Sequence, residues 1–141
     1  MKKAPRRFEY RTRVRYHEVD RMGVVYHPIF ARYFENARIE LLREIGFPHR
    51  RLEDSGAWFV VTELQVTYLA NTGYDAEVRV ETTVSRLRRA SVDFNYQVFE
   101  REKLLTRGKV ELACTDGKGS VIRIPEALHQ ALKECEGNVE K

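Results

Sequence analysis

Apolar and polar residues alternate along five segments of the chain, with the period of two that is typical of β-strands with one buried face. The first segment is 8–16 (FEYRTRVRY), and the later ones are 57–69, 76–87, 90–100 and 104–115. Strands of this kind form antiparallel sheets in which one face packs on the core and the other meets water. Residues 119–124 would add a further strand at an edge of the sheet.

The alternation also predicts which side chains lie on each face. On the segment 57–69, the apolar face carries Val60, Leu64, Val66 and Tyr68. On the segment 90–100, Asp93 lies on the polar face, opposite Val92 and Phe94. Each of these strands is therefore expected to have one dry and one wet face.

A different pattern, with apolar residues three and four positions apart, follows the first strand. It begins at Pro28 and continues to about Ile45, with apolar residues at Ile29, Phe30, Tyr33, Phe34, Ala37, Leu41, Leu42 and Ile45. This spacing is typical of a helix that buries one broad stripe. Proline suits the first helical position, and Gly46 is a stop signal. A short helix is expected at 125–136.

One strand, one long helix and four or five further strands define an α+β fold. The helix has one sheet to lie against, so the sheet must curl around it. No repeat, low-complexity tract or linker interrupts the 141 residues. The chain is therefore expected to form one domain, with a basic arm at 1–7 and a polar tail at 137–141.

Composition narrows the classes of protein. The longest uncharged apolar run, residues 57–61, is far shorter than the about 20 residues of a membrane span, and no apolar segment follows the basic N-terminus as in a secretory signal. Cys114 and Cys135 lack metal-binding spacing and are too few for a disulfide scaffold. These features predict a cytoplasmic protein with reduced thiols. The formal charge of +4 favours an anionic partner.

Reactive side chains gather in one loop, residues 16–28 (YHEVDRMGVVYHP), directly before the long helix. At a helix N-terminus, backbone N–H groups and the helix dipole favour developing negative charge. Asp20 lies seven residues before His27, across a turn that contains Gly23, so its carboxylate could face a carbonyl held by those amides. A nucleophile or base opposite an oxyanion site is the arrangement that acyl transfer requires.

The spacing Tyr16-x3-Asp20-x2-Gly23-x2-Tyr26-His27, followed by a helix reading F-x3-FENARIELL, resembles the 4-hydroxybenzoyl-CoA thioesterase class of hotdog-fold enzymes. It is most similar to the acyl-CoA thioesterase branch associated with the Tol-Pal system in bacteria. The resemblance spans about residues 10–125. Members of the family have proline near the position of Asn71. With asparagine there, this loop is not expected to have the rigidity that proline gives.

The resemblance implies a hotdog fold, in which a curled antiparallel sheet of five or six strands wraps the helix. It implies hydrolysis of an acyl-CoA without a cofactor or metal. Asp20 would attack the thioester or activate water, the His27 amide would polarise the carbonyl, and the side chains of Tyr16 and His27 would support them. The substrate would also contact Gly23, Val24, Val25 and Tyr26. Sites of this family form between subunits, which implies a homodimer or homotetramer through strand 57–69.

The residue types in this loop are sufficient for the hydrolysis of a thioester. A thiol has a pKa of about 8.5, so a thiolate leaves without a general acid and one carboxylate with an oxyanion site is sufficient. No G-x-S-x-G or H-E-x-x-H motif is present. Taken alone, however, Asp20 could cap the turn into the helix, His27 could be an N-cap residue, and Tyr16 could serve in packing.

Arginines and a serine lie between two predicted strands, at an expected hairpin: Arg86, Arg88, Arg89 and Ser91. Guanidinium groups bind phosphate well, so this cluster could hold the nucleotide end of coenzyme A. The alternative is a solvated turn whose charges keep a sheet edge from aggregating.

The other ionisable residues have simpler expected roles. His17 and Glu18 flank the motif and are expected at the surface. Glu63 lies on the polar face of its strand, and a role in the site is left open. Cys114 is expected to be a buried, inert side chain. Ion pairs along the long helix are expected among Glu35, Arg38, Glu40 and Arg43.

Two other functions remain open at this point. A hotdog hydratase or dehydratase would need a histidine and a carboxylate to move protons at the acyl chain, a role that His27 and Asp20 could imitate. A non-catalytic acyl-CoA sensor would use the basic N-terminal arm to bind DNA. No recognised nucleic-acid module accompanies that arm, so no nucleic-acid partner is expected.

Overall fold

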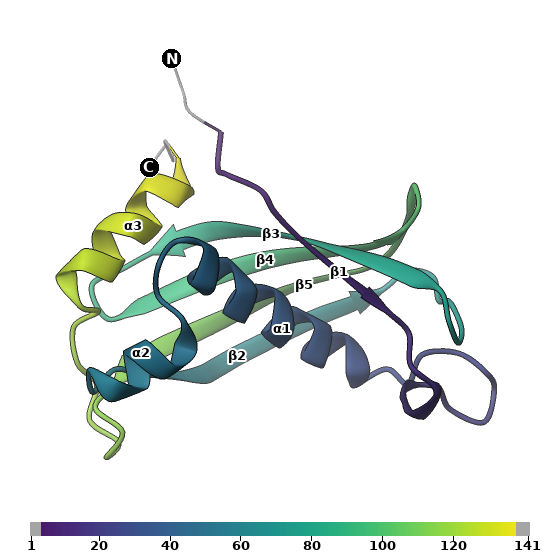
Figure 1. Ribbon diagram of the computed structural model, residues 1–141, viewed down its shortest axis with the longest axis horizontal. Helices are drawn as coiled ribbons and strands as arrows, with labels where there is room; N and C mark the ends of the chain where they lie inside the picture. Colours follow the sequence, from purple (N-terminus) through teal and green to yellow (C-terminus); the bar gives the residue numbers. More distant parts are fainter. Residues whose placement is uncertain (1–3, 138–141) are drawn as a thin grey trace.

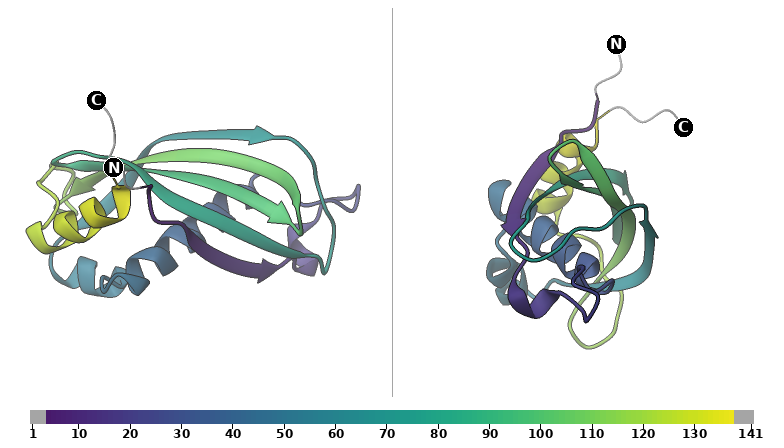
Figure 2. Two further views of the ribbon diagram at one scale, coloured as in Figure 1. Left: turned by 90° about the horizontal axis from the view of Figure 1, so that it is seen from above. Right: turned by 90° about the vertical axis from the view of Figure 1, so that its right-hand side faces the viewer.

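The computed structural model describes residues 4–137. The elements, in chain order, are β1 (Phe8–Arg13), the 3-10 turn η1 (Tyr16–Glu18), α1 (Ile29–Glu44), α2 (His49–Asp54), β2 (Trp58–Tyr68), β3 (Glu77–Leu87), β4 (Ser91–Glu100), β5 (Lys103–Thr115) and α3 (Glu126–Glu136). Figure 1 shows the sheet curling around α1, and Figure 2 shows the same wrap end-on. The predicted α+β fold, with a curled antiparallel sheet around one long helix, is confirmed.

The strand order places β1 and β2 at the two edges of the sheet. The order is β1-β3-β4-β5-β2, and every neighbouring pair is antiparallel. β1 pairs with β3 from Phe8↔Thr82 to Arg13↔Glu77. β2 follows the long helix in sequence but pairs with β5, so its outer edge has no neighbouring strand among residues 4–137.

The apolar stripe of α1 forms the centre of the core. Its buried residues are those expected from the spacing: Phe30, Tyr33, Phe34, Ala37, Leu41 and Leu42. Phe34 stacks on Tyr96 of β4 with ring centroids 4.5 Å apart. The helix approaches the sheet closely at Gly108 of β5, because a Cβ there would lie 2.4 Å from the Phe34 ring. Pro28 caps the helix rather than opening it.

Three features differ from the sequence prediction: the end of the first strand, the helix α2 and the segment 119–124. The first strand ends at Arg13 rather than at 16, because residues 16–18 turn into η1. α2 was not predicted, since six residues with one buried side chain, Leu52, carry no periodic signal. Residues 119–124 form one isolated bridge, Thr115↔Val121, instead of a strand, because the chain folds into a tight loop at Gly117 and Gly119, both with positive φ.

The face prediction for β2 was wrong. Trp58, Val60, Val61, Leu64 and Tyr68 are all 42–50% exposed, on both faces of the strand. A bulge between Val61 and Glu63 shifts the register against β5, and in the described part of the chain no further strand covers the outer edge. Phe59 and Val66 pack partly against the core, but within the described residues the other apolar side chains of this strand remain largely exposed.

The described part of the N-terminal arm is tied to the body of the protein. Arg6 pairs with Glu44, its amide donates to the Cys135 carbonyl, and Arg7 pairs with Glu81 at 3.2 Å. Residues 1–3 of the predicted arm and 138–141 of the predicted tail lie outside the described residues. Within residues 4–137, no helix has the length and apolar character needed to cross a membrane.

The close approach of α1 to the sheet gives the first prediction. Gly108→Ala is expected to lower the free energy of unfolding by about 1–3 kcal/mol, because the added methyl group overlaps Phe34 and forces the helix away. Denaturant unfolding measures the change. The neighbouring exposed substitution Arg107→Ala is the control and should stay within about 0.5 kcal/mol. Equal stability of the two variants would contradict the packing described here.

Candidate active site

The reactive loop is a tight β-hairpin that lies beyond the N-terminus of α1, at the right-hand end of Figure 1. The hairpin is held by an isolated bridge between Val19 and Val25, and the Asp20 amide donates to the Val24 carbonyl at 2.9 Å. The Gly23 amide donates to the Asp20 carbonyl at 2.9 Å, and Gly23 has a φ of 81°. This left-handed conformation favours glycine, which explains why the turn contains one.

Asp20 lies at the tip of this hairpin and is half-buried. Its Oδ1 atom accepts a hydrogen bond from the Met22 amide at 2.8 Å. The carboxylate therefore does cap a turn, as the simpler interpretation proposed, but the turn is its own and not the start of the helix. Within the described part of the chain, no donor reaches Oδ2. One oxygen is thus held by a hydrogen bond, while the other has no hydrogen-bond donor among the described residues.

The helix start offers fewer free amides than the sequence suggested. The first-turn amides of Ile29, Phe30 and Ala31 donate at 2.8, 3.3 and 3.1 Å to carbonyls three residues earlier. Pro28 has no N–H at all. For the His27 amide, residues 4–137 provide no acceptor. The donor left for a ligand at this end of α1 is therefore a residue just outside the helix.

Tyr68, the last residue of β2, holds the backbone at His27. Its hydroxyl donates to the His27 carbonyl at 3.1 Å, and its ring lies edge-on to both His27 and Phe30. Burial raises the pKa of Tyr68, which keeps the hydroxyl protonated and able to donate. The sequence singled out Tyr68 as part of a strand and gave no sign of this contact, which joins residues 41 positions apart.

The predicted supporting side chains do not contact Asp20. Tyr16 is 80% exposed, and its ring packs edge-on against Tyr74 at 5.6 Å. The His27 imidazole is exposed and lies against the rings of Tyr26 and Tyr68. Among the described residues, neither side chain forms a hydrogen bond with the Asp20 carboxylate. In one chain, Tyr16 and His27 therefore have the packing contacts of the simpler interpretation.

The segment after β2 packs against the hairpin, backbone to backbone. Buried Val25 donates its amide to the Thr72 carbonyl at 3.0 Å, and Val24 bridges to Gly73. A Cβ on Gly73 would lie 2.8 Å from the Gly23 carbonyl oxygen, so the two segments touch backbone to backbone. Asn71, where the resembling family has proline, donates to the Val25 carbonyl at 3.4 Å and so contributes a tie of its own.

Glu18 is buried, which contradicts its predicted place at the surface. It is 3% exposed, and its Oε1 atom accepts hydrogen bonds from the Tyr33 hydroxyl at 2.9 Å and the Arg15 amide at 2.8 Å. The prediction extended the alternation of the first strand through Tyr16. The 3-10 turn interrupts that alternation and turns the Glu18 side chain toward α1.

The arginine hairpin between β3 and β4 is present, but Arg88 is already occupied. Its guanidinium meets both carboxylate oxygens of Asp93, at 3.0 and 3.4 Å, and this hydrogen bonding raises the pKa of Arg88. Asp93 is 1% exposed, contrary to its predicted place on a wet face, because Arg88 and Lys109 cover it. Ser91 accepts from Arg88 at 3.2 Å. Arg86 and Arg89 are exposed and form no ion pair within residues 4–137.

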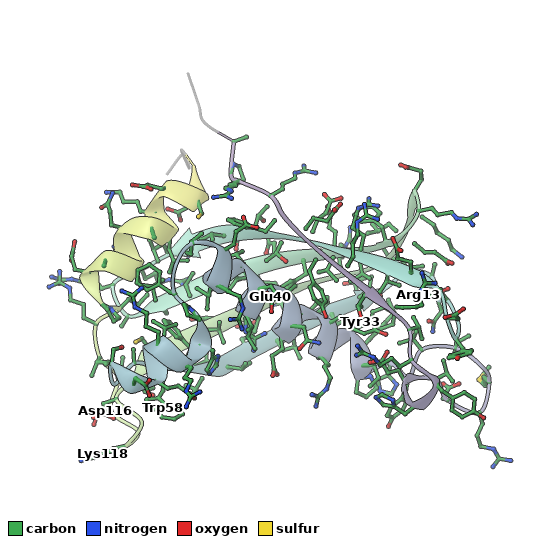
Figure 3. All side chains as sticks on the ribbon, viewed as in Figure 1. Arg13, Tyr33, Glu40, Trp58, Asp116 and Lys118 are labelled. Carbon is green, nitrogen blue, oxygen red and sulfur yellow. The ribbon has the colours of Figure 1, made fainter. Side chains whose placement is uncertain are left out.

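The two halves of the predicted site lie at opposite ends of one chain. β3 begins beside Arg13, next to the Asp20 hairpin, and reaches the arginine hairpin at its other end. Arg89 and Ala90 accept hydrogen bonds from Ile124 and Cys114, at the end of the sheet near α3. Figure 3 labels Arg13 and Trp58 at these two ends. A single chain does not bring the arginines to Asp20.

The remaining candidates lie outside the site. Glu63 is exposed and pairs with Gln65 of the same strand. Cys114 is buried as predicted, and burial raises the pKa of its thiol. On α1, the pair Arg43–Glu40 forms at 3.4 Å. Among residues 4–137, no three His, Cys, Asp or Glu side chains are grouped as the ligands of a metal ion would be.

Comparison with known proteins identifies the family. The model of the thioesterase-like superfamily matches residues 14–132, and the chain belongs to this family, whose members have the hotdog fold. The acyl-CoA thioesterase YbgC of Haemophilus influenzae is 33% identical over 126 residues, which cover 88% of this chain and 93% of that protein.

Solved structures agree with the family assignment. A DHNA-CoA thioesterase from Staphylococcus aureus superposes with a TM-score of 0.87 at 32% identity, covering 91% of this chain and 89% of that one. A hypothetical protein from Thermus thermophilus superposes with a TM-score of 0.88 at 36% identity, covering 91% and 98%. The likeness thus extends over nearly the whole of each chain.

The pairing of Arg88 with a buried carboxylate gives the second prediction. Arg88→Met is expected to lower the free energy of unfolding by about 1–3 kcal/mol, because Asp93 loses its two-point partner and keeps only Lys109. Thermal and denaturant unfolding measure the loss. Arg86→Met, on the same hairpin and exposed, should change stability by less than about 0.5 kcal/mol. The reverse order would show that Arg88 is not the structural arginine.

Proposed function

We propose that this protein hydrolyses the thioester of an acyl-CoA, releasing the free acid and coenzyme A. Asp20 serves as the nucleophile or general base, and the His27 amide donates to the oxyanion. The observation that carries the proposal is the hairpin itself: it presents a carboxylate with one unbonded oxygen and, at its base, a backbone amide without an acceptor. The names of the YbgC and DHNA-CoA relatives support this substrate class.

Two routes fit this pair of groups. In the first, Asp20 takes a proton from water while the water oxygen bonds to the thioester carbon. In the second, the Asp20 oxygen itself forms that bond, and water later cleaves the resulting anhydride. In both, the carbonyl oxygen becomes negative and receives the His27 N–H, and the C–S bond then breaks to release the thiolate. Incorporation of oxygen-18 into Asp20 during a single turnover would distinguish the second route from the first.

A second copy of the chain would complete the site. Trp58, at the start of β2, pairs with Thr115 beside the arginine hairpin, whereas Tyr68, at its end, holds His27. Antiparallel pairing of two β2 edges places the start of one strand beside the end of the other. It would therefore carry Arg86 and Arg89 of one copy toward Asp20 of its mate, where they could bind the phosphates of coenzyme A. The exposed apolar residues of β2 would be buried there.

The alternative functions gain less support. A hydratase needs His27 and Asp20 to act together, yet no hydrogen bond joins their side chains in the described residues. A DNA-binding sensor needs free positive charge on the N-terminal strand, yet Arg11 pairs with Glu9 and Glu77 there. The narrower assignment to the 4-hydroxybenzoyl-CoA class and its Tol-Pal-associated branch rests on the motif from Tyr16 to His27 and stays a prediction.

The role of Asp20 gives the third prediction. Asp20→Asn should keep the fold and lower kcat about 10²–10⁴-fold, because the amide can neither attack nor accept the proton of water. Thiol release from a panel of aromatic, short and long acyl-CoAs measures the loss, and circular dichroism checks the fold. Asp54→Asn, on the exposed end of α2, is the matched control and should retain full turnover. Undiminished activity in Asp20→Asn would refute the proposed chemistry.

The fourth prediction concerns the second copy. Leu64→Glu places a charge in the middle of the exposed β2 edge, so the dimer is expected to dissociate and thiol release to fall with it. Sedimentation or light scattering measures the mass of the particle alongside turnover. Ala127→Glu adds the same charge on exposed α3 and should change neither. A fully active monomer would show that one chain suffices.

A further inference from the structure

We propose that Glu18 is a positioning residue of this enzyme: anchored to Tyr33 of α1, it holds Asp20 and the His27 amide in register with each other. The inference rests on the proposed function of those two groups. The motif from Tyr16 to His27 does not specify Glu18, and the sequence predicts it at the surface. Its burial beside the loop that carries Asp20 therefore indicates a role in positioning.

Four hydrogen bonds meet at Glu18. Its Oε1 atom accepts from the Tyr33 hydroxyl at 2.9 Å and from the Arg15 amide at 2.8 Å. Its own amide donates to the Arg15 carbonyl at 2.9 Å, and its carbonyl accepts from the Tyr26 amide at 2.9 Å. One residue thus connects the 3-10 turn, the long helix and the segment that enters the helix. Figure 3 labels Tyr33 on α1, in the half of the helix nearest the loop.

The two reactive groups extend from this junction in opposite directions along the chain. Asp20 is two residues after Glu18, at the tip of the hairpin. His27 is one residue after Tyr26, whose amide Glu18 holds. The Glu18–Tyr26 hydrogen bond is the first rung of the hairpin, followed by the Val19↔Val25 bridge. A shift at Glu18 would therefore move Asp20 and the His27 amide relative to each other.

The Tyr33 contact supplies the fixed reference for this junction. Tyr33 is 1% exposed in the apolar stripe of α1, so its hydroxyl cannot move without moving the helix. Burial and the Glu18 hydrogen bond raise the pKa of Tyr33, which keeps the hydroxyl a donor. Arg15 and Tyr10 are the other ionisable groups that act on this hydroxyl. A buried carboxylate is costly unless donors satisfy it, and here two donors bond its Oε1 atom.

Three single variants test the proposal. Glu18→Ala removes the acceptor and should lower kcat about 10–100-fold with KM nearly unchanged, since the misplaced groups act on the reacting carbonyl rather than on coenzyme A. Glu18→Gln keeps an acceptor oxygen and should stay within about 3-fold of the parent. Tyr33→Phe removes one hydroxyl and should fall between them. Tyr96→Phe, from an equally buried tyrosine away from the loop, is the control and should keep kcat.

A double variant separates positioning from general loss of stability. In Asp20→Asn/Glu18→Ala, the further loss of kcat beyond Asp20→Asn should be clearly smaller than the loss in Glu18→Ala alone, because Asp20 no longer needs to be placed and only the His27 amide can still be misplaced. A further drop of the same size as in Glu18→Ala alone would overturn the proposal. So would a Glu18→Gln enzyme as slow as Glu18→Ala, because the hydrogen bonds would then not be the cause.

Failure of the positioning role and failure of the proposed function give different results in these variants. Full activity of Asp20→Asn would refute the function, whereas parental kcat in Glu18→Ala would overturn the positioning role alone. If Glu18→Ala does not fold, Tyr33→Phe decides: it preserves the ring and its packing, so parental kcat in that variant overturns the proposal. Circular dichroism and thermal unfolding of each variant accompany the kinetics.

Discussion

The packing of α1 into the curled sheet is the constraint on which the rest of the structure depends. Phe34 lies directly over Gly108, and the apolar stripe leaves the helix no freedom to slide or rotate. The position of the helix N-terminus is thereby set by the core. Two hydrogen bonds fix the hairpin at that end: Tyr33 of α1 donates to Glu18, and Tyr68 of β2 donates to the His27 carbonyl. The chemistry proposed at the end of the helix would thus depend on packing along its length.

The candidate site is built mainly from main-chain geometry, which explains what the sequence could and could not predict. The helix was predictable because its spacing repeats over four turns, and so was a turn at Gly23 between Asp20 and His27, but the pairing that makes this loop a hairpin was not. The resemblance pointed to the His27 amide, but the residues alone could not show that it lacks an acceptor within residues 4–137, since that depends on the first turn of α1 satisfying its own N–H groups. Tyr68 was missed because its contact with His27 spans 41 positions, and no local pattern reports that distance.

The other misses share one cause: exposure was judged from a single strand or turn. Glu18 and Asp93 occupy positions that alternation marks as wet, yet Tyr33 covers the first, and Arg88 with Lys109 covers the second. The prediction for β2 was wrong in the opposite direction, because most of its apolar side chains are left exposed by residues 4–137. Alternation predicts polarity well; burial depends on neighbours distant in sequence.

The long free edge of β2 also has a consequence for the life of the newly made chain. Its eleven residues are protected by one bulge and by the charge of Glu63, a light defence for a strand of that length. Until something covers it, this edge can template disordered association with any extended peptide nearby. Correct assembly and aggregation of the newly made chains therefore compete from the moment of synthesis. The rate of synthesis in the cell then influences how much of the protein remains folded.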